Sequence, residues 1–148
     1  SMKNISLLSL LLISILLFSC GGTNCEFSNL TITTAVDGKQ TNQKTVKDCY
    51  SVTKEGEGEL AIYTIEGKET SEVFSMSYYD EKSKVDLKDS QGTSLKFLNV
   101  FIGGKKTEWR KNKGHNIYKI EKQDNLSFIF GENVKKENSV SVSVTFSK

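Results

Sequence analysis

Residues 139–146, SVSVSVTF, decide the fold class, because every second residue in this stretch is apolar. Successive side chains of an extended strand point to opposite faces of its sheet. Val140, Val142, Val144 and Phe146 therefore share one face, and hydroxyl side chains cover the other. The alternation predicts a β-strand with one face in a core and the other in water.

The same period of two continues through the chain from residue 27 to the end. Turn residues such as Asp37-Gly38 and Gly103-Gly104 separate the alternating segments. No part of this region shows a helical stripe of three turns. We expect strands at residues 30–36, 46–52, 60–65, 73–79, 85–88, 93–102, 107–111, 117–122, 126–130 and 139–146.

About nine or ten strands joined by short loops predict an all-β fold, either an antiparallel β-sandwich or a small β-barrel. We expect residues 27–148 to form this single domain. Residues 80–83 are polar enough for a hairpin loop, so segment 85–88 should return beside 73–79. LKFLNVFI, residues 95–102, is apolar on both faces, which favours a strand central to the fold.

The amino-terminal region has the pattern of a signal peptide. Residues 5–18 carry no charge and follow Lys3. They are too few to span a bilayer, which takes about 20 apolar residues. Leu17-Phe18-Ser19-Cys20 resembles the lipobox of bacterial lipoproteins, in which the cysteine is acylated and becomes the new amino terminus.

The lipobox resemblance implies that residues 1–19 are a removed signal peptide and that residues 20–26 are a lipidated cysteine and a tether. It also implies attachment to a membrane in the bacterial cell envelope, at the periplasmic face of the outer membrane or at the cell surface. Several acyl chains would make this attachment stable. The alternative is an ordinary secretory signal that is cut after Gly21 or Gly22.

The chain has three cysteines, an odd number for an exported protein. If Cys20 carries lipid, Cys25 and Cys49 remain, and an oxidising compartment favours a disulfide between them. Closing a loop of about 25 residues would stabilise the fold by roughly 3 to 4 kcal/mol. Two free buried thiols are the alternative.

The residue types needed for common catalytic and metal sites are scarce. His115 is the only histidine, and we expect it in an exposed turn among lysines. A Ser-His-acid triad needs a histidine that a third group orients, and a zinc centre needs three or four converging ligands. The sequence also has no phosphate-binding glycine loop. We therefore expect no enzyme activity, no cofactor and no metal. A net charge of +2 gives no support for nucleic acid as a partner.

Residues 103–122 are rich in lysine and arginine with interleaved aromatic residues. On a strand, Thr107, Trp109 and Lys111 would share a face, so the indole and some cations could form one binding surface. The alternative is that Trp109 fills the core and the lysines protect an exposed strand edge. The possible binding surface consists of Lys105, Lys106, Trp109, Arg110, Lys111, Lys113, His115 and Tyr118.

Trp109 followed by Lys113-Gly114 is similar in kind to the inhibitory region of the membrane-anchored and periplasmic inhibitors of c-type lysozyme. Those proteins are lipoproteins or secreted β-barrels of similar size. The resemblance covers a short part of the chain and implies an inhibitory role only for Lys113. The serine-bearing loop and the late cysteine of that family are not evident here.

These observations favour a non-enzymatic, membrane-anchored binding module for a protein or glycan partner. A carrier of a small apolar ligand is the alternative, and a hydrolase on a β-scaffold has the least support. In a carrier, inward residues would line a cavity in a barrel, whereas at ordinary packing density the same residues would fill the core. The candidate cavity residues are Phe74, Met76, Leu95, Phe97, Phe128 and Phe130.

Overall fold

The computed structural model describes residues 24–79, 84–87, 90–132 and 139–148. The expected signal peptide, Cys20 and the expected loop at 80–83 lie outside these residues. Within the described residues, the secondary structure consists of ten strands and two short 3₁₀ segments, η1 (Gly58–Leu60) and η2 (Lys111–Lys113). The strands are β1 (Phe27–Val36), β2 (Lys39–Glu55), β3 (Ile62–Gly67), β4 (Val73–Tyr78), β5 (Lys84–Leu87), β6 (Ser90–Ile102), β7 (Lys105–Arg110), β8 (His115–Lys122), β9 (Asn125–Glu132) and β10 (Val140–Ser147).

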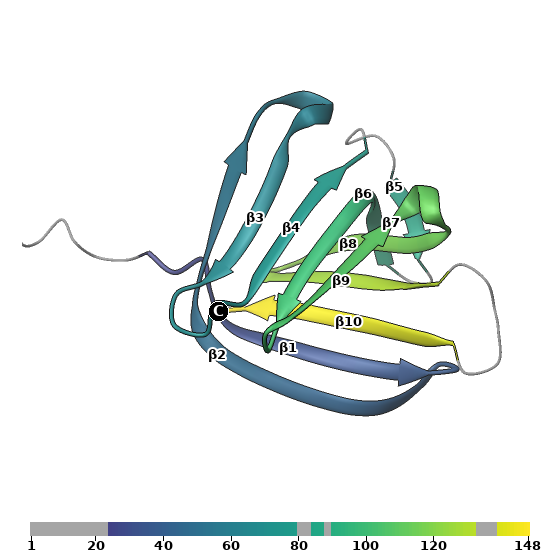
Figure 1. Ribbon diagram of the computed structural model, residues 1–148, viewed down its shortest axis with the longest axis horizontal. Helices are drawn as coiled ribbons and strands as arrows, with labels where there is room; N and C mark the ends of the chain where they lie inside the picture. The colour runs from purple at the N-terminus through teal and green to yellow at the C-terminus, as the bar shows by residue number, and fades with distance from the viewer. Residues whose placement is uncertain (1–23, 80–83, 88–89, 133–138) are drawn as a thin grey trace, which may run out of the picture.

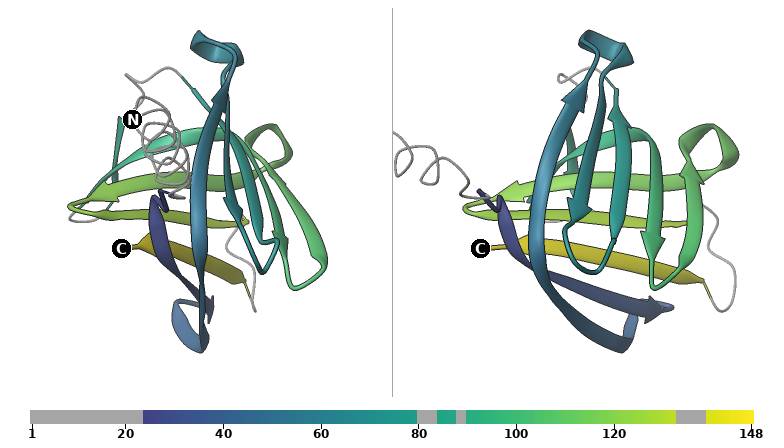
Figure 2. Two further views of the ribbon diagram at one scale, coloured as in Figure 1. Left: turned by 90° about the vertical axis from the view of Figure 1, so that its left-hand side faces the viewer. Right: turned by 60° about the vertical axis from the view of Figure 1, so that its left-hand side comes forward.

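Eight of the strands close into an antiparallel barrel, in the order β4-β3-β2-β1-β10-β9-β8-β6 (Figure 1). Pairing of β4 with β6 completes the ring, and Figure 2 shows the strands wrapping around a common interior. The remaining strands, β5 and β7, both pair with β6. The all-β prediction is confirmed, and of its two forms the barrel is the one that the protein adopts.

Strand β6 is the most connected element of the barrel, as its apolar sequence predicts. At Phe97 it lies between Ser77 of β4 and Arg110 of β7. Near its start it pairs with β5 and with β8. The expected pairing of the fifth strand with the fourth is wrong, because β3 and β6 already occupy the two edges of β4 and β5 pairs with β6 instead.

The core is organised around Phe146 of β10, which is fully buried. Its ring centroid lies 5.0 Å from that of Phe74, 5.3 Å from Tyr50, 5.6 Å from Phe27 and 6.3 Å from Phe128. Three of these contacts are edge-to-face, the geometry that aromatic quadrupoles favour. Each ring comes from a different strand, so the alternation of β10 ties distant parts of the chain to one centre.

The outward positions of the same strands carry hydroxyl side chains. Thr145 of β10 lies beside Thr31 of β1 and Ser127 of β9. The Ser127 and Thr145 hydroxyls are 2.9 Å apart, and the Thr31 and Thr45 hydroxyls are 3.4 Å apart. Such cross-strand hydroxyl pairs stabilise the solvent face of a sheet. Both faces therefore favour one register, since a slip of one residue would exchange them.

A disulfide joins Cys25 to Cys49 and fixes the start of β1 against β2, as the cysteine count predicts. Beside it, the Glu26 N–H donates to the Tyr50 carbonyl oxygen at 2.8 Å. Strand β2 is longer than expected, because the polar residues 39–45 continue the hairpin with β1 and lack the apolar alternation that would reveal a strand.

The Asp48 carboxylate, next to this disulfide, organises the loop between β3 and β4. It accepts hydrogen bonds from the N–H groups of Cys49, Glu69 and Thr70 and from the Thr70 hydroxyl, at 2.6 to 3.1 Å. Desolvation alone would raise the pKa of Asp48, but these hydrogen bonds lower it to about 2. Gly67 permits the approach, since a Cβ there would lie 2.5 Å from Asp48 Oδ2.

We predict that Asp48→Asn lowers stability near pH 7 and that its deficit disappears in acid. The folded-state pKa of Asp48 is depressed to about 2. Its contribution is therefore complete above about pH 4 and is lost as the pH falls toward 2. Because the carboxylate is only partly buried, the deficit at neutral pH should not exceed about 1 kcal/mol.

Urea denaturation of wild type and variant between pH 7 and pH 2 measures this difference. Asp86→Asn, at an exposed position of β5, is the matched control and should track wild type at every pH. An Asp48→Asn deficit that stays constant down to pH 2 would contradict the role given to the ionised carboxylate.

Candidate functional site at the barrel mouth

The inward-facing residues change character along the barrel. On β8, Ile117 is fully buried, and Lys119 and Glu121 follow it at the next two inward positions. On β10, Phe146 is fully buried, and Lys148 follows beyond the end of the strand. Charged groups are not buried without partners because desolvation costs too much. This end of the barrel therefore stays open to water.

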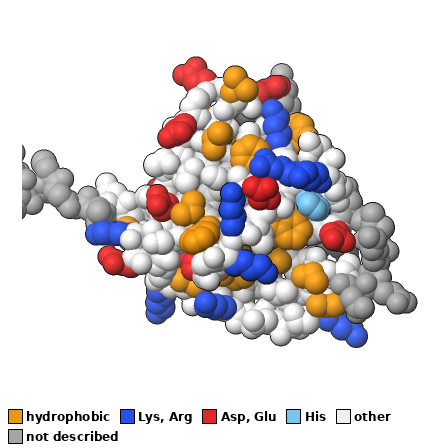
Figure 3. Space-filling model, in the orientation of Figure 1, with side chains coloured by type: hydrophobic (Ala, Val, Ile, Leu, Met, Phe, Trp, Pro, Cys, Tyr) orange, Lys and Arg blue, Asp and Glu red, His pale blue; other side chains and the backbone are white. Residues whose placement is uncertain are grey.

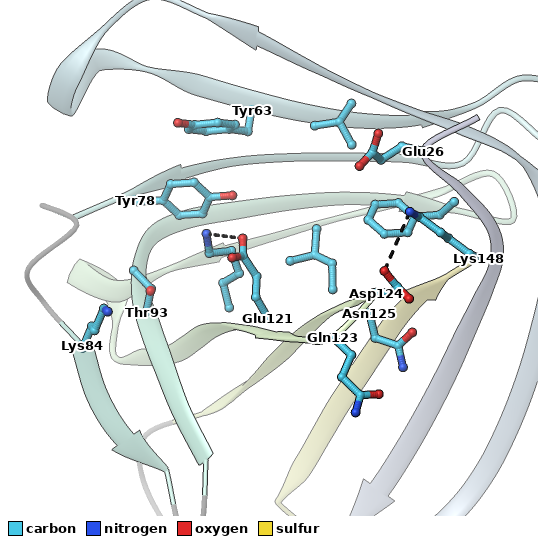
Figure 4. A pocket seen from close by; sticks show the side chains of 14 residues that line it. Glu26, Tyr63, Tyr78, Lys84, Thr93, Glu121, Gln123, Asp124, Asn125 and Lys148 are labelled. Carbon is cyan, nitrogen blue, oxygen red and sulfur yellow. Dashed lines mark hydrogen bonds and ion pairs between the residues drawn. The ribbon is translucent and has the colours of Figure 1, made fainter. Parts of the chain in front are cut away.

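A pocket of about 850 Å³ occupies this mouth (Figure 4). Its volume lies within the roughly 300 to 1,000 Å³ typical of small-molecule sites. Apolar and aromatic side chains from β1, β2, β3, β4 and β9 line one part of it, and polar side chains line the rest. The lining residues are Glu26, Phe27, Val52, Tyr63, Tyr78, Lys84, Thr93, Lys119, Glu121, Gln123, Asp124, Asn125, Leu126 and Lys148.

Tyr63 and Tyr78 form an aromatic pair in the pocket wall, with ring centroids 4.7 Å apart and planes tilted by 40°. Their strands are adjacent, and Tyr63 lies opposite Met76, two residues before Tyr78. Burial raises the pKa of Tyr78 well above its usual range, and the negative charge of Glu121 adds to this effect. Tyr78 is therefore a neutral phenol that can donate a hydrogen bond.

The Lys119 ammonium lies in the pocket between Tyr78 and Glu121. Its Nζ is 4.4 Å from the Tyr78 ring centroid, within cation–π range. The same atom is 2.9 Å from Glu121 Oε1, the pair marked beside Glu121 in Figure 4. The Lys119 side chain is only 17% exposed, whereas that of Glu121 is 69% exposed. A partly desolvated cation thus has a well-solvated carboxylate as its partner.

Both ends of the described chain lie at the rim of the pocket. Glu26 follows the disulfide-bonded Cys25, and Lys148 follows β10. Lys148 Nζ is 3.9 Å from Asp124 Oδ1 in the turn between β8 and β9, and both side chains are exposed. Such a surface pair contributes little to stability.

The pocket is not lined by the residues that the sequence suggested for a cavity. Phe74, Met76, Leu95, Phe128 and Phe130 are buried in the core. They belong to one buried hydrophobic cluster and so fill the core, the alternative considered above. Phe97 lies outside this core, half-buried under the Arg110 guanidinium, which is 4.6 Å from its ring centroid.

Trp109 of the predicted binding surface packs inward. Its ring centroid is 5.1 Å from those of Phe130 and His115, and Nε1 is buried with no hydrogen-bond partner among the described residues. His115 is not an exposed turn residue as expected. It begins β8 half-buried, and its Nδ1 accepts a hydrogen bond from the Arg110 N–H at 2.9 Å. Trp109 therefore packs at the edge of the core. The hydrogen bond between Arg110 and His115 stabilises the turn that joins β7 to β8.

The cations of the predicted surface are spread over several environments. Lys105, Lys106 and Lys113 are exposed. Lys111 Nζ donates to the Ser94 hydroxyl at 2.6 Å and lies 5.2 Å from the Tyr79 ring centroid. Figure 3 shows blue basic side chains interspersed with orange apolar ones on the face that it draws.

Arg110 and Tyr118 of the predicted surface also make hydrogen bonds within the protein. The Arg110 guanidinium, besides covering Phe97, donates to Asn99 Oδ1 at 3.4 Å. The Tyr118 hydroxyl donates to Asn116 Oδ1 at 3.3 Å. The structure thus brings Lys111 and Arg110 close to aromatic rings, but these rings are Tyr79 and Phe97 and not the indole of Trp109.

The sequence pattern did not predict that the pocket residues Lys119, Glu121, Tyr63 and Tyr78 form a site. Lys119 and Glu121 belong to the basic stretch 103–122 and look like ordinary surface charges in it. The available signal is their phase, since both continue the inward series that begins with Ile117. Charges at core-facing positions of a strand indicate a hydrated cavity.

The described residues contain no group of three or more His, Cys, Asp or Glu side chains placed to hold a metal ion. Within the same residues, no helix has the length and apolarity needed to cross a membrane. Comparison of the chain with protein-family models, with curated proteins and with solved structures finds no match.

We predict that Trp109→Ala destabilises the protein by about 2 kcal/mol, less than the 3 to 5 kcal/mol of a fully buried tryptophan. The indole packs against Phe130 and His115, so its removal leaves a gap. Lys113→Ala, at an exposed position in η2 just after β7, should change stability by less than about 0.5 kcal/mol. Chemical denaturation measures both, and an unchanged Trp109→Ala midpoint would contradict the packing role.

Proposed function

We propose that this chain is a non-enzymatic lipoprotein of the bacterial cell envelope that binds a small, largely apolar ligand in its barrel mouth. The observation that carries this proposal is the pocket of about 850 Å³ at one end of a closed barrel. Ligand sites commonly combine apolar walls with a few placed polar groups. Here Phe27, Leu126 and the Tyr63–Tyr78 pair supply the walls, and Lys119 is a placed polar group.

The wall of the pocket includes an apolar side chain that a ligand would cover. Val52 of β2 lines the pocket and is 41% exposed. Covering such surface releases about 25 cal/mol for each Å² removed from water. A rigid barrel also loses little conformational freedom when it binds a ligand, which favours affinity.

The proposed anchor is compatible with ligand exchange at a bilayer. If Cys20 is acylated, Glu26 on the pocket rim follows it by six positions in the chain. Such a segment reaches at most about 20 Å. The rim would therefore stay close to the membrane surface, where apolar ligands concentrate.

A protein or glycan partner remains the second candidate, and it would use the outer surface formed by β6, β7 and the adjacent residues Tyr79 and Lys111. Phe97 and Tyr79 lie there beside Arg110 and Lys111, which suits stacking against a sugar ring or an acidic partner. Both cations already make hydrogen bonds within the protein, so they have less to offer a partner. Lysozyme inhibition would be one form of this candidate, and Lys113 is exposed for it.

We predict that an uncharged fluorescent probe, N-phenyl-1-naphthylamine, binds wild type and that Val52→Trp weakens this binding about tenfold. The new indole would occupy the pocket, and Val52 is exposed enough to be replaced without harm to the core. Ile129→Trp is the control, because Ile129 is 37% exposed and is not among the pocket residues.

Fluorescence titration of the three proteins gives their dissociation constants, and native mass spectrometry reports any ligand that co-purifies. Equal weakening by Val52→Trp and Ile129→Trp would place the probe elsewhere. A wild type that binds no probe and carries no co-purified ligand would overturn ligand binding in the barrel.

We predict that the chain expressed in a bacterium with residues 1–19 intact is found in the membrane fraction, and that Cys20→Ser abolishes this location. Intact mass should correspond to a chain that begins at an acylated Cys20 and carries one disulfide. Cys49→Ser is the control, since it removes the disulfide and leaves the lipid site. An unmodified amino terminus after Gly21 or Gly22 would instead indicate an ordinary secretory signal.

A further inference from the structure

We infer that the pocket selects amphiphiles that carry a carboxylate, and that Lys119 binds this carboxylate in place of Glu121. The inference rests on the proposed ligand-binding function and names the class of ligand. Its basis is the placement of one cation inside the mouth, the carboxylate that already contacts it, and the apolar walls around both.

Lys119 differs from the other lysines that line the pocket. Its side chain is 17% exposed, whereas that of Lys148 is 65% exposed and pairs with an equally solvated Asp124. Lys84 is also exposed. A compact ammonium is strongly hydrated, so partial burial is costly unless an anion or an aromatic face compensates. Of the three lysines that line the pocket, Lys119 should therefore contribute most to the binding free energy of a ligand anion.

The Lys119 ammonium has capacity for another acceptor. It carries three N–H donors. Glu121 Oε1 takes one of them at 2.9 Å, and the Tyr78 ring lies on another side with its centroid at 4.4 Å. The Tyr78 hydroxyl stays protonated because burial raises its pKa. It can donate to an anion bound at Lys119.

Glu121 has the properties of a replaceable partner. Its side chain is 69% exposed, so it can turn into water at little cost when an incoming carboxylate takes its place. It also identifies the chemistry of the replacement, because the position beside Lys119 Nζ is already filled by a carboxylate oxygen. The six charged lining residues are balanced, three acidic and three basic, so selection depends on this local contact rather than on a general positive field.

The part of the ligand next to its carboxylate should be apolar. Tyr63, Tyr78, Val52, Phe27 and Leu126 surround the space next to the Lys119–Glu121 pair, and Figure 4 shows Tyr63, Tyr78 and Glu121 around the same hollow. A chain or ring system bearing one carboxylate would place its apolar part against these residues and its head at Lys119. A ligand with several charges would leave some of them unpaired against the apolar walls.

A matched pair of probes tests the inference. Dansylaminoundecanoic acid and its methyl ester share one apolar body and differ in the negative charge. Wild type should bind the acid about tenfold more tightly than the ester, the effect of one charged hydrogen bond near the surface. Lys119→Met should bring the two affinities to equality without weakening the ester, and Glu121→Gln should strengthen the acid several-fold.

Two controls accompany these variants. Lys148→Met removes a rim cation and should keep the wild-type preference for the acid. Circular dichroism and thermal unfolding establish that each variant is folded, and a misfolded Lys119→Met would be replaced by Lys119→Gln. The titrations use the chain from Cys25 onward with the disulfide formed, and vesicle-free buffer removes membrane partitioning as a source of signal.

Wild type that binds the acid and the ester equally would overturn the inference and leave the proposed function standing. A preference that survives in a folded Lys119 variant, or that disappears in Lys148→Met, would place the selection at another cation and also overturn it. Failure of both probes to bind would overturn the proposed function together with the inference.

Discussion

Pairing between β4 and β6 is the constraint on which the rest of the structure depends. It joins the two ends of the sheet, so the inner faces of eight strands must share one interior. Every alternating segment then has one face committed to that interior and one to water. Closure also removes the open edges at which sheets aggregate, except along the short strands β5 and β7, where Lys84, Lys105 and Lys106 are exposed.

A single interior with two kinds of lining explains both the stability and the candidate site. Around Phe146 the inward residues are aromatic and pack edge to face. Toward the mouth, Lys119 and Glu121 of β8 and Lys148, just after β10, line the pocket. No sharp boundary separates core from pocket, because both follow from one alternation. Phe27 and Leu126 belong to both, since they pack with the core and line the pocket.

Local pattern predicted most of the fold. The alternation located all ten strands, and the cysteine count gave the Cys25–Cys49 bond. Closure was not predictable, because pairing of β4 with β6 depends on geometry between segments and not on either sequence alone. The same reason explains the wrong pairing of β5 with its sequence neighbour β4. The polar half of β2 was not predicted as a strand, because its own sequence does not alternate. Pairing with β1 makes it a strand.

The candidate site was harder to predict than the fold. Lys119 lies in a basic stretch in which Trp109 and its neighbouring lysines were predicted to form the binding surface. Only its position in the alternation of β8 distinguishes an inward lysine from an outward one. Tyr63 and Tyr78 come from strands whose register brings their rings together, and nothing in either segment indicates the other.

The position of Lys148 has a practical consequence for handling the protein. Anything appended after Lys148 leaves the barrel beside the pocket entrance and competes with ligands for it. The tight turn at Asp37-Gly38 lies at the opposite end of β1, roughly 30 Å away for a strand of this length. Purification handles, dyes or surface-coupling groups inserted there would leave the entrance clear.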